Sequence, residues 1–183
     1  EDEFSATTPS GLVEIGRITT AGRTSVLMAA RQVLDAPLRE GVNREVEWKE
    51  RFGPLCAASK PLVIYDKFVG QQTVRRYLYN QGTGDGLTWF LARVGMTPGR
   101  RVRIITAVTD SVDRGQRFDE EAMVTGFLRM MASMADRDLR LELVLVPERT
   151  RGEKGRGVER FGHDRHLRFG ERAALALGAG MQT

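Results

Sequence analysis

The fold is indicated by one short apolar run, Pro61-Leu62-Val63-Ile64-Tyr65. The run is partly β-branched and opens with a proline, as a buried strand does. Two further runs follow it, Val102–Val108 and the alternating Leu139–Val146, which ends before Pro147. Helical patterns separate the three runs, so the chain alternates strand, helix, strand, helix, strand. This order is typical of a mainly parallel sheet flanked by helices, and the predicted fold class is α/β.

Two segments between these runs have the apolar spacing of helices. The first is Val74–Leu78, which a turn-rich stretch at Gln81–Gly86 separates from a continuation at Leu87–Val94. The second is Asp119–Ala135, whose methionines fall on one side of a helix and are interpreted as core filler. These segments supply the crossover helices that parallel strands need.

The last part of the chain reads as a basic loop followed by two short strands. The loop runs over 148–162, and the strands are predicted at His163–Phe169 and Arg172–Leu177 with a tight turn at Gly170-Glu171. The stretch Arg149–Arg172 holds eight basic residues against four acidic ones, which accounts for the whole net charge of +4. Such a stretch favours phosphate-bearing partners, and the alternative is arginine on solvated loops. The basic residues of the loop are Arg149, Arg151, Lys154, Arg156 and Arg160.

The N-terminal residues differ in pattern from the rest. Residues 1–10 read as a loose tail, Leu12–Ile18 alternates as a strand does, and Thr24–Leu34 is suited to a helix. Proline, glycine and asparagine at 36–43 then break the chain. The resulting division is an N-terminal extension or linker with a strand and a helix at 1–42, and a single domain at 43–183.

Composition limits the kind of protein. At 183 residues and 20.4 kDa, with 41% hydrophobic and 28% charged residues, the chain suits one globular domain, with or without an arm, and excludes wholesale disorder. Cys56 is the single cysteine, which excludes an intramolecular disulfide and leaves too few thiols for a structural zinc site. No apolar run approaches the about 18 residues of a membrane span. The polar first residues show no signal peptide, so we expect a cytoplasmic domain cut from a larger multidomain protein.

Both histidines of the chain lie three residues apart, among arginines. In a strand, His163 and Arg165 share one face, while His166 and Arg168 share the other. An imidazole beside a guanidinium suits a phosphoryl group, since the imidazole can attack phosphorus or move a proton and the guanidinium can bind two phosphate oxygens. No metal site is predicted, because the histidines point to opposite faces and no third ligand is evident. The alternative is an edge strand whose polar side faces water.

Asp66 and Lys67 directly follow the first predicted strand. Ligands of parallel α/β sheets gather beyond the carboxyl ends of the strands, so Asp66 could orient His163 from a neighbouring strand. The alternative is that Asp66 caps a helix beginning near Gln71.

Three short elements together resemble the phospholipase D superfamily: Val63–Phe68, Arg103–Thr106, and His163-Asp164-Arg165 running into Gly178-Ala179-Gly180. More narrowly, the chain from about Asn43 onward is similar to the phospholipase D-like domain at the C-terminus of proteins with a microtubule-interacting-and-trafficking (MIT) domain, and to its bacterial relatives. The resemblance implies a phospholipase D-like single domain that uses no cofactor.

The superfamily's working motif is a histidine, any residue, a lysine, four residues and an aspartate. Here His163 holds the histidine position, Arg165 stands in place of lysine, and Gly170 falls where aspartate belongs, with Glu171 one step later. An active site of the superfamily needs two motifs, so the second would come from a homodimer partner. The trafficking relatives are lipid-binding modules without phospholipase activity, which agrees with these departures.

These observations lead to three hypotheses. The first is a degenerate phospholipase D-like module that binds phosphate-bearing ligands, above all anionic lipid headgroups, and recruits the full protein to a membrane surface. The second is a phosphodiesterase or nuclease that acts on nucleic acid through His163 as a homodimer, in a bacterial defence system. The third is a protein-interaction domain. The predicted phosphate-binding residues are Arg165, Asp66, Lys67, His166 and Arg168.

Overall fold

The computed structural model describes residues 3–7, 13–17, 43–59, 61–82, 86–109, 112–113, 115–147, 149–151, 157–159, 165–170 and 173–176. The chain divides into two compact units, 1–60 and 61–183, each of which is described by itself. The division of the sequence at 42/43 into an extension and a domain stays a prediction.

The first unit contains a hairpin and a short helical segment. Strand β1 (Glu3–Thr7) pairs antiparallel with β2 (Val13–Arg17), so the strand predicted around 12–18 is confirmed. The loose tail predicted for residues 1–10 is wrong over β1. This strand is stabilised by its backbone hydrogen bonds to β2, which its short and largely polar sequence does not indicate. The helix predicted at 24–34 lies outside the described residues. The helical segment consists of α2 (Arg44–Glu47), the π-helical turn η2 (Trp48–Phe52) and α3 (Gly53–Ala58).

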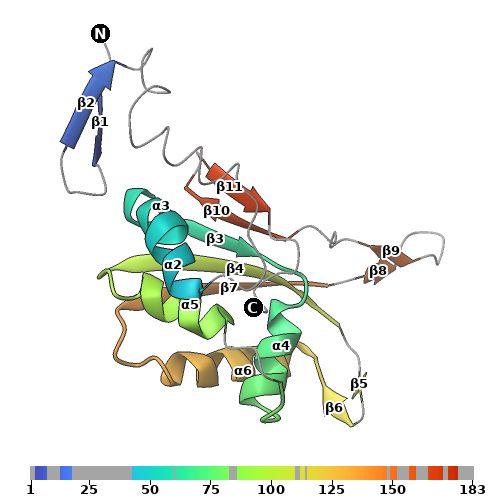
Figure 1. The fold of residues 1–183 in the computed structure, drawn as a ribbon. Helices are drawn as coiled ribbons and strands as arrows, with labels where there is room; N and C mark the ends of the chain where they lie inside the picture. The colour runs from blue at the N-terminus through green and yellow to red at the C-terminus, as the bar shows by residue number, and fades with distance from the viewer. Residues whose placement is uncertain are drawn as a thin grey trace. The chain divides into compact units, whose positions relative to one another are not determined.

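The second unit is built on a five-stranded mixed sheet with strand order β11-β10-β3-β4-β7 (Figure 1). Strands β3, β4 and β7 run parallel, whereas β10 is antiparallel to both β3 and β11. The α/β class is therefore confirmed, but the sheet is mixed rather than mainly parallel, because β10 pairs antiparallel with β3 on one side and with β11 on the other. The strands are β3 (Leu62–Tyr65), β4 (Arg100–Val108), β7 (Leu139–Pro147), β10 (His166–Phe169) and β11 (Ala173–Ala176).

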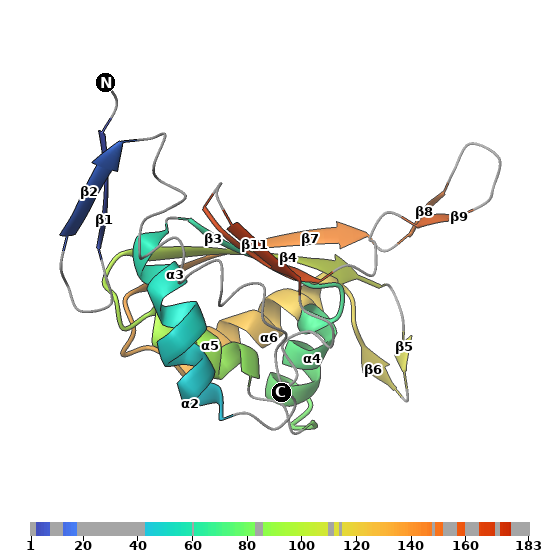
Figure 2. The same ribbon diagram turned by 45° about the horizontal axis from the view of Figure 1, so that its top comes forward.

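Three helices of the second unit lie on one face of this sheet (Figure 2). They are α4 (Val69–Tyr77), α5 (Gly86–Val94) and α6 (Glu120–Ala132). The steps from β3 to β4 and from β4 to β7 run in the same direction across the sheet. Because parallel crossovers share one hand, two steps in the same direction place their helices on the same side. The opposite face carries no helix among the described residues of this unit.

The core lies between the sheet and these helices. Ile64 and Ile104 are fully buried on the strands, and Met123 and Met130 are fully buried on α6. The prediction of the methionines as core is confirmed for these two and for Met134, whereas Met131 is partly exposed. Helices α4 and α6 approach closely at Gly126, where a Cβ would lie 3.2 Å from Val74 Cα. Apolar burial of this kind is the main term that stabilises the unit.

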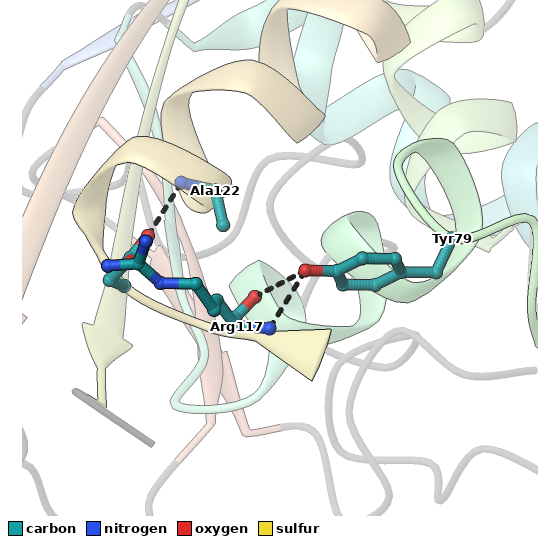
Figure 3. Close-up of polar contacts among 4 residues, drawn as sticks. Tyr79, Arg117 and Ala122 are labelled. Carbon is teal, nitrogen blue, oxygen red and sulfur yellow. Dashed lines mark hydrogen bonds and ion pairs between the residues drawn. The ribbon is translucent and has the colours of Figure 1, made fainter. Parts of the chain in front are cut away.

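A short hairpin, β5 (Val112–Asp113) with β6 (Gln116–Arg117), leads into α6. The Tyr79 hydroxyl donates to Arg117 O at 3.0 Å and accepts from Arg117 N at 2.8 Å, which ties the end of α4 to β6 (Figure 3). Asp119 caps α6 by accepting from Ala122 N at 3.0 Å, and it pairs with the Arg117 guanidinium at 2.7 Å. These polar contacts fix where α6 begins.

The basic segment after β7 contains a second hairpin, β8 (Arg149–Arg151) paired antiparallel with β9 (Gly157–Glu159). The loop predicted over 148–162 is therefore wrong in these two strands. Arginine and glycine dominate the sequence here, so no apolar alternation signals a strand, and backbone pairing alone makes the ladder. In the described part of the chain, no helix is long and apolar enough to cross a membrane.

Candidate anion-binding site

The candidate site forms where β3 ends and α4 begins. Asp66 is 1% exposed, and its backbone N–H donates to Ile105 O at 3.1 Å, which extends the pairing of β3 with β4 by one residue. Its carboxylate Oδ1 accepts from Phe68 N at 2.8 Å. Phe68 is the N-cap residue of α4 and its own side chain makes no capping hydrogen bond, so the Asp66 carboxylate stabilises the turn before α4 rather than the helix end itself. The predicted capping of a helix near Gln71 is therefore not seen, since α4 begins at Val69 with Phe68 at its N-cap position. The predicted orientation of His163 by Asp66 stays a prediction, because His163 lies outside the described residues.

Thr106 on β4 holds the turn from the other side. Its fully buried hydroxyl donates to Lys67 O at 3.2 Å and accepts from Gly70 N at 3.0 Å. A Cβ at Gly70 would lie 2.9 Å from both Thr106 Cγ2 and Met123 Sδ, so glycine is required for this close approach. The turn that carries Asp66 and Lys67 is thus fixed by the core.

Arg165 reaches this turn from the residue before β10. Its Nε lies 3.8 Å from Asp66 Oδ1, and its guanidinium carbon lies 4.8 Å from the centre of the Phe68 ring. The Lys67 ammonium lies 5.7 Å from the same ring centre. Phe68 is therefore a shared aromatic contact for two cations, and both distances are within the range of cation–π attraction. We call Asp66, Lys67, Phe68 and Arg165 the Asp66–Arg165 cluster.

The described side chains of the Asp66–Arg165 cluster carry a net positive charge. Its charged side chains are two cations and one carboxylate, and all three have little exposure: 5% for Lys67, 1% for Asp66 and 17% for the Arg165 side chain. Charges interact more strongly where water is scarce. A guanidinium has several N–H donors, so one ion pair leaves it able to bind phosphate oxygens. Cationic groups of this kind are the ones that bind phosphate or carboxylate groups in proteins.

The structure divides the five predicted phosphate-binding residues between two places. Asp66, Lys67 and Arg165 come together, as described above. His166 and Arg168 point to the other face of the sheet, where the His166 ring stacks on Tyr65 at a centroid distance of 4.8 Å. This separation follows from the side-chain alternation of a strand, since Leu167 between them is fully buried on the helix-covered face.

The remaining predicted residues fall mostly outside the described part of the chain. His163, Lys154, Arg156 and Arg160 are among them, so the proposed catalytic role of His163 stays a prediction. Arg149 and Arg151 lie in β8, for which the backbone alone is described.

Sequence reasoning missed two residues of the site. Phe68 ends the Val63–Phe68 element of the resemblance, yet its contact with two cations follows from tertiary structure alone. Thr106 could have been found, because it is a polar residue close to the carboxyl end of a buried strand, which is where ligands and turn anchors gather.

No metal-binding cluster is formed by three or more His, Cys, Asp or Glu side chains within the described residues. Comparison of the chain with protein-family models, curated proteins and solved structures gave no match. The resemblance to the phospholipase D superfamily therefore stays a hypothesis that depends on the short motifs.

Proposed function

We propose that this chain is a phosphate-binding module of phospholipase D-like type, which takes anionic lipid headgroups at the Asp66–Arg165 cluster and recruits the full protein to a membrane surface. The observation that carries the proposal is that Arg165 meets Asp66 and Phe68, although these residues are far apart in the sequence. Arg165 Nε lies 3.8 Å from Asp66 Oδ1, and the Arg165 guanidinium carbon lies 4.8 Å from the centre of the Phe68 ring. Two cations around one ring, at the carboxyl end of a central strand, are suited to a phosphate.

A binding role is favoured over catalysis by the way the motif positions are used. Gly170 stands where the superfamily has an aspartate, and here its φ is 59° and its N–H donates to Pro61 O at 2.8 Å. The position thus serves the turn between β10 and β11, in a conformation that suits glycine. Arg165 keeps a phosphate-binding group in the lysine position. These features fit a site that has kept binding and lost the groups of turnover.

A membrane surface is the favoured source of the phosphate because of the neighbouring basic stretch. The segment Arg149–Arg172 contains the whole net positive charge of the chain. Basic residues near an anionic leaflet each contribute roughly 1 kcal/mol of attraction. The cluster would then hold one headgroup while the basic stretch lies along the surface.

The test is sedimentation of the purified chain with vesicles of phosphatidylcholine alone or with added phosphatidylserine. Arg165→Gln should weaken binding to the anionic vesicles about fivefold, which corresponds to roughly 1 kcal/mol. Arg165→Lys should retain more binding, because it keeps the charge. Arg137→Gln is the matched control: Arg137 is an ion-paired surface arginine next to the amino end of β7, at the other end of the parallel strands.

Two results would count against the proposal. Equal binding of Arg165→Gln and the control would remove the cluster from the contact, provided that both variants melt like the parent chain. Cleavage of DNA by the parent chain that is abolished by His163→Ala would instead establish the nuclease hypothesis. Reversal of charge at Arg151, Lys154 and Arg156 should also weaken vesicle binding, with a steep dependence on salt.

A further inference from the structure

The face of the sheet opposite the helices, which we call the open face, has a side-chain pattern that the proposed function does not use. One row across the strands consists of Tyr65, its neighbours His166 and Ile105, and Val144 beyond Ile105, all in register. All four side chains are partly exposed. The row therefore presents a stacked aromatic pair, Tyr65 on His166 with an angle of 7° between the rings, beside two aliphatic side chains.

A second group on the open face is cationic. Arg168 and Arg103 both lie in register with Val63 of β3, one on each side of it. Arg101 and Arg140 lie in register with each other, one side-chain repeat further along β4 and β7. All four arginines are exposed. The described acidic residue among them is Glu142, which accepts from Arg103 Nε at 2.9 Å, so positive charge predominates.

The row that contains Tyr65 and His166, which we call the aromatic row, runs across the strands, and the arginines lie next to it along the strands. Along a strand, residues on one face are separated by two positions, or about 6.6 Å. The arginines therefore begin about 6.6 Å from the aromatic row and continue for one further repeat. A single-stranded nucleic acid presents flat bases on one side of its sugar chain and phosphates on the other, which is the complement of these two rows.

We infer that the open face binds single-stranded nucleic acid, with bases against the row of Tyr65 and His166 and phosphates against Arg101, Arg103, Arg140 and Arg168. The Tyr65–His166 pair gives sequence-tolerant stacking, and the arginines neutralise the backbone. Duplex nucleic acid lacks accessible base faces and gains the electrostatic part alone. An acidic protein partner would match the arginines but would make no use of the stacked pair. The inference does not rest on the function proposed above, since Arg165 contacts Asp66 rather than this face.

The test is fluorescence anisotropy of the full chain with labelled oligouridine and oligothymidine of about eight nucleotides, a length in the range of sheet-based single-strand sites. Tyr65→Leu should weaken binding about tenfold, whereas Tyr65→Phe should retain it because the ring remains. Arg168→Gln and Arg140→Gln should each weaken binding and lower the slope of log affinity against log salt by about 0.7. Arg129→Gln is the matched control, because Arg129 is an exposed arginine on α6, on the helix-covered side.

Each outcome decides for or against this surface. Loss of binding in Tyr65→Leu and Arg168→Gln, with Arg129→Gln unaffected, supports the open face. Equal affinity for a duplex overturns single-strand recognition and leaves a general anion-binding surface. The same conclusion follows if the arginine variants lose binding while Tyr65→Leu does not. Competition by polyglutamate as strong as by oligouridine overturns it in favour of an acidic protein partner. Loss in Arg165→Gln, with Tyr65→Leu and Arg168→Gln unaffected, would overturn the open face and move the contact to the Asp66–Arg165 cluster.

Discussion

The two faces of the five-stranded sheet are made of alternate residues of the same strands, yet they have opposite chemistry. On the helix-covered face, Ile64, Ile104 and Leu167 are fully buried. One residue away along the same strands, Tyr65, Arg103 and Arg168 are partly or fully exposed. The difference arises because both crossovers pass over one side of the sheet and leave the other side for side chains that contact solvent or a ligand. One face therefore supplies stability, and the other carries partly exposed or exposed side chains at these described positions.

The largest effect should come from neighbouring isoleucines on opposite faces of β4. Ile104→Ala should lower the free energy of unfolding by about 2–5 kcal/mol, because Ile104 is fully buried and its removal leaves a cavity. Ile105→Ala should cost less than half as much, since Ile105 lies partly exposed on the open face. Urea unfolding of both variants measures the two costs. Similar losses of unfolding free energy in the two variants would contradict the distinction between the two faces.

A smaller effect is expected at the end of β3, where Asp66 stabilises the turn. Asp66→Ala should cost about 1–3 kcal/mol, because it removes the acceptor of the Phe68 N–H and the carboxylate beside Arg165. Asp66→Asn keeps an acceptor for Phe68 and should cost less. Thermal and urea unfolding of the two variants separate the hydrogen bond from the charge. If Asp66→Ala left the free energy of unfolding unchanged, the Asp66–Arg165 cluster would not support the fold.

The smallest effect should be that of the Arg103–Glu142 pair on the open face. Both side chains are at least half exposed, at 50% and 58%, so a double-mutant cycle with Arg103→Gln and Glu142→Gln should give a coupling of about 0.2–1 kcal/mol. The coupling should decrease with added salt, because exposed charges are screened. A coupling above this range that is insensitive to salt would show that the open face is covered, and would contradict its role as an accessible surface.

Local pattern was a good guide wherever one residue's environment depends on its own strand or helix. The apolar runs at 61–65 and 102–108 gave strands β3 and β4, and the methionine stripe gave the buried side of α6. The alternation around His166 also placed Arg168 on the same face as His166, with Leu167 buried between them. These features depend on spacing, which a sequence displays directly.

Pairing between segments was harder to predict than the segments themselves. The strands β1, β8 and β9 are polar or arginine-rich and carry no strong apolar signal, so the hairpins β1–β2 and β8–β9 depend on backbone hydrogen bonding. The antiparallel direction of β10 beside β3 was also missed, since a run of residues does not state which neighbour it joins. In the candidate site, Phe68 gained its role when two cations from different segments reached its ring.

The sequence by itself determined the α/β class, the positions of the central strands and the residues that carry charge and aromatic rings, because hydrophobic period and residue type are local properties. Tertiary structure alone decided which of those residues meet. Chain folding brought Arg165 to Asp66, and strand register aligned Tyr65 with His166 and set Arg103 and Arg168 on either side of Val63. The physical reason is that strand order and crossover hand, rather than any single segment, determine which side chains share a site and which face of the sheet is left open.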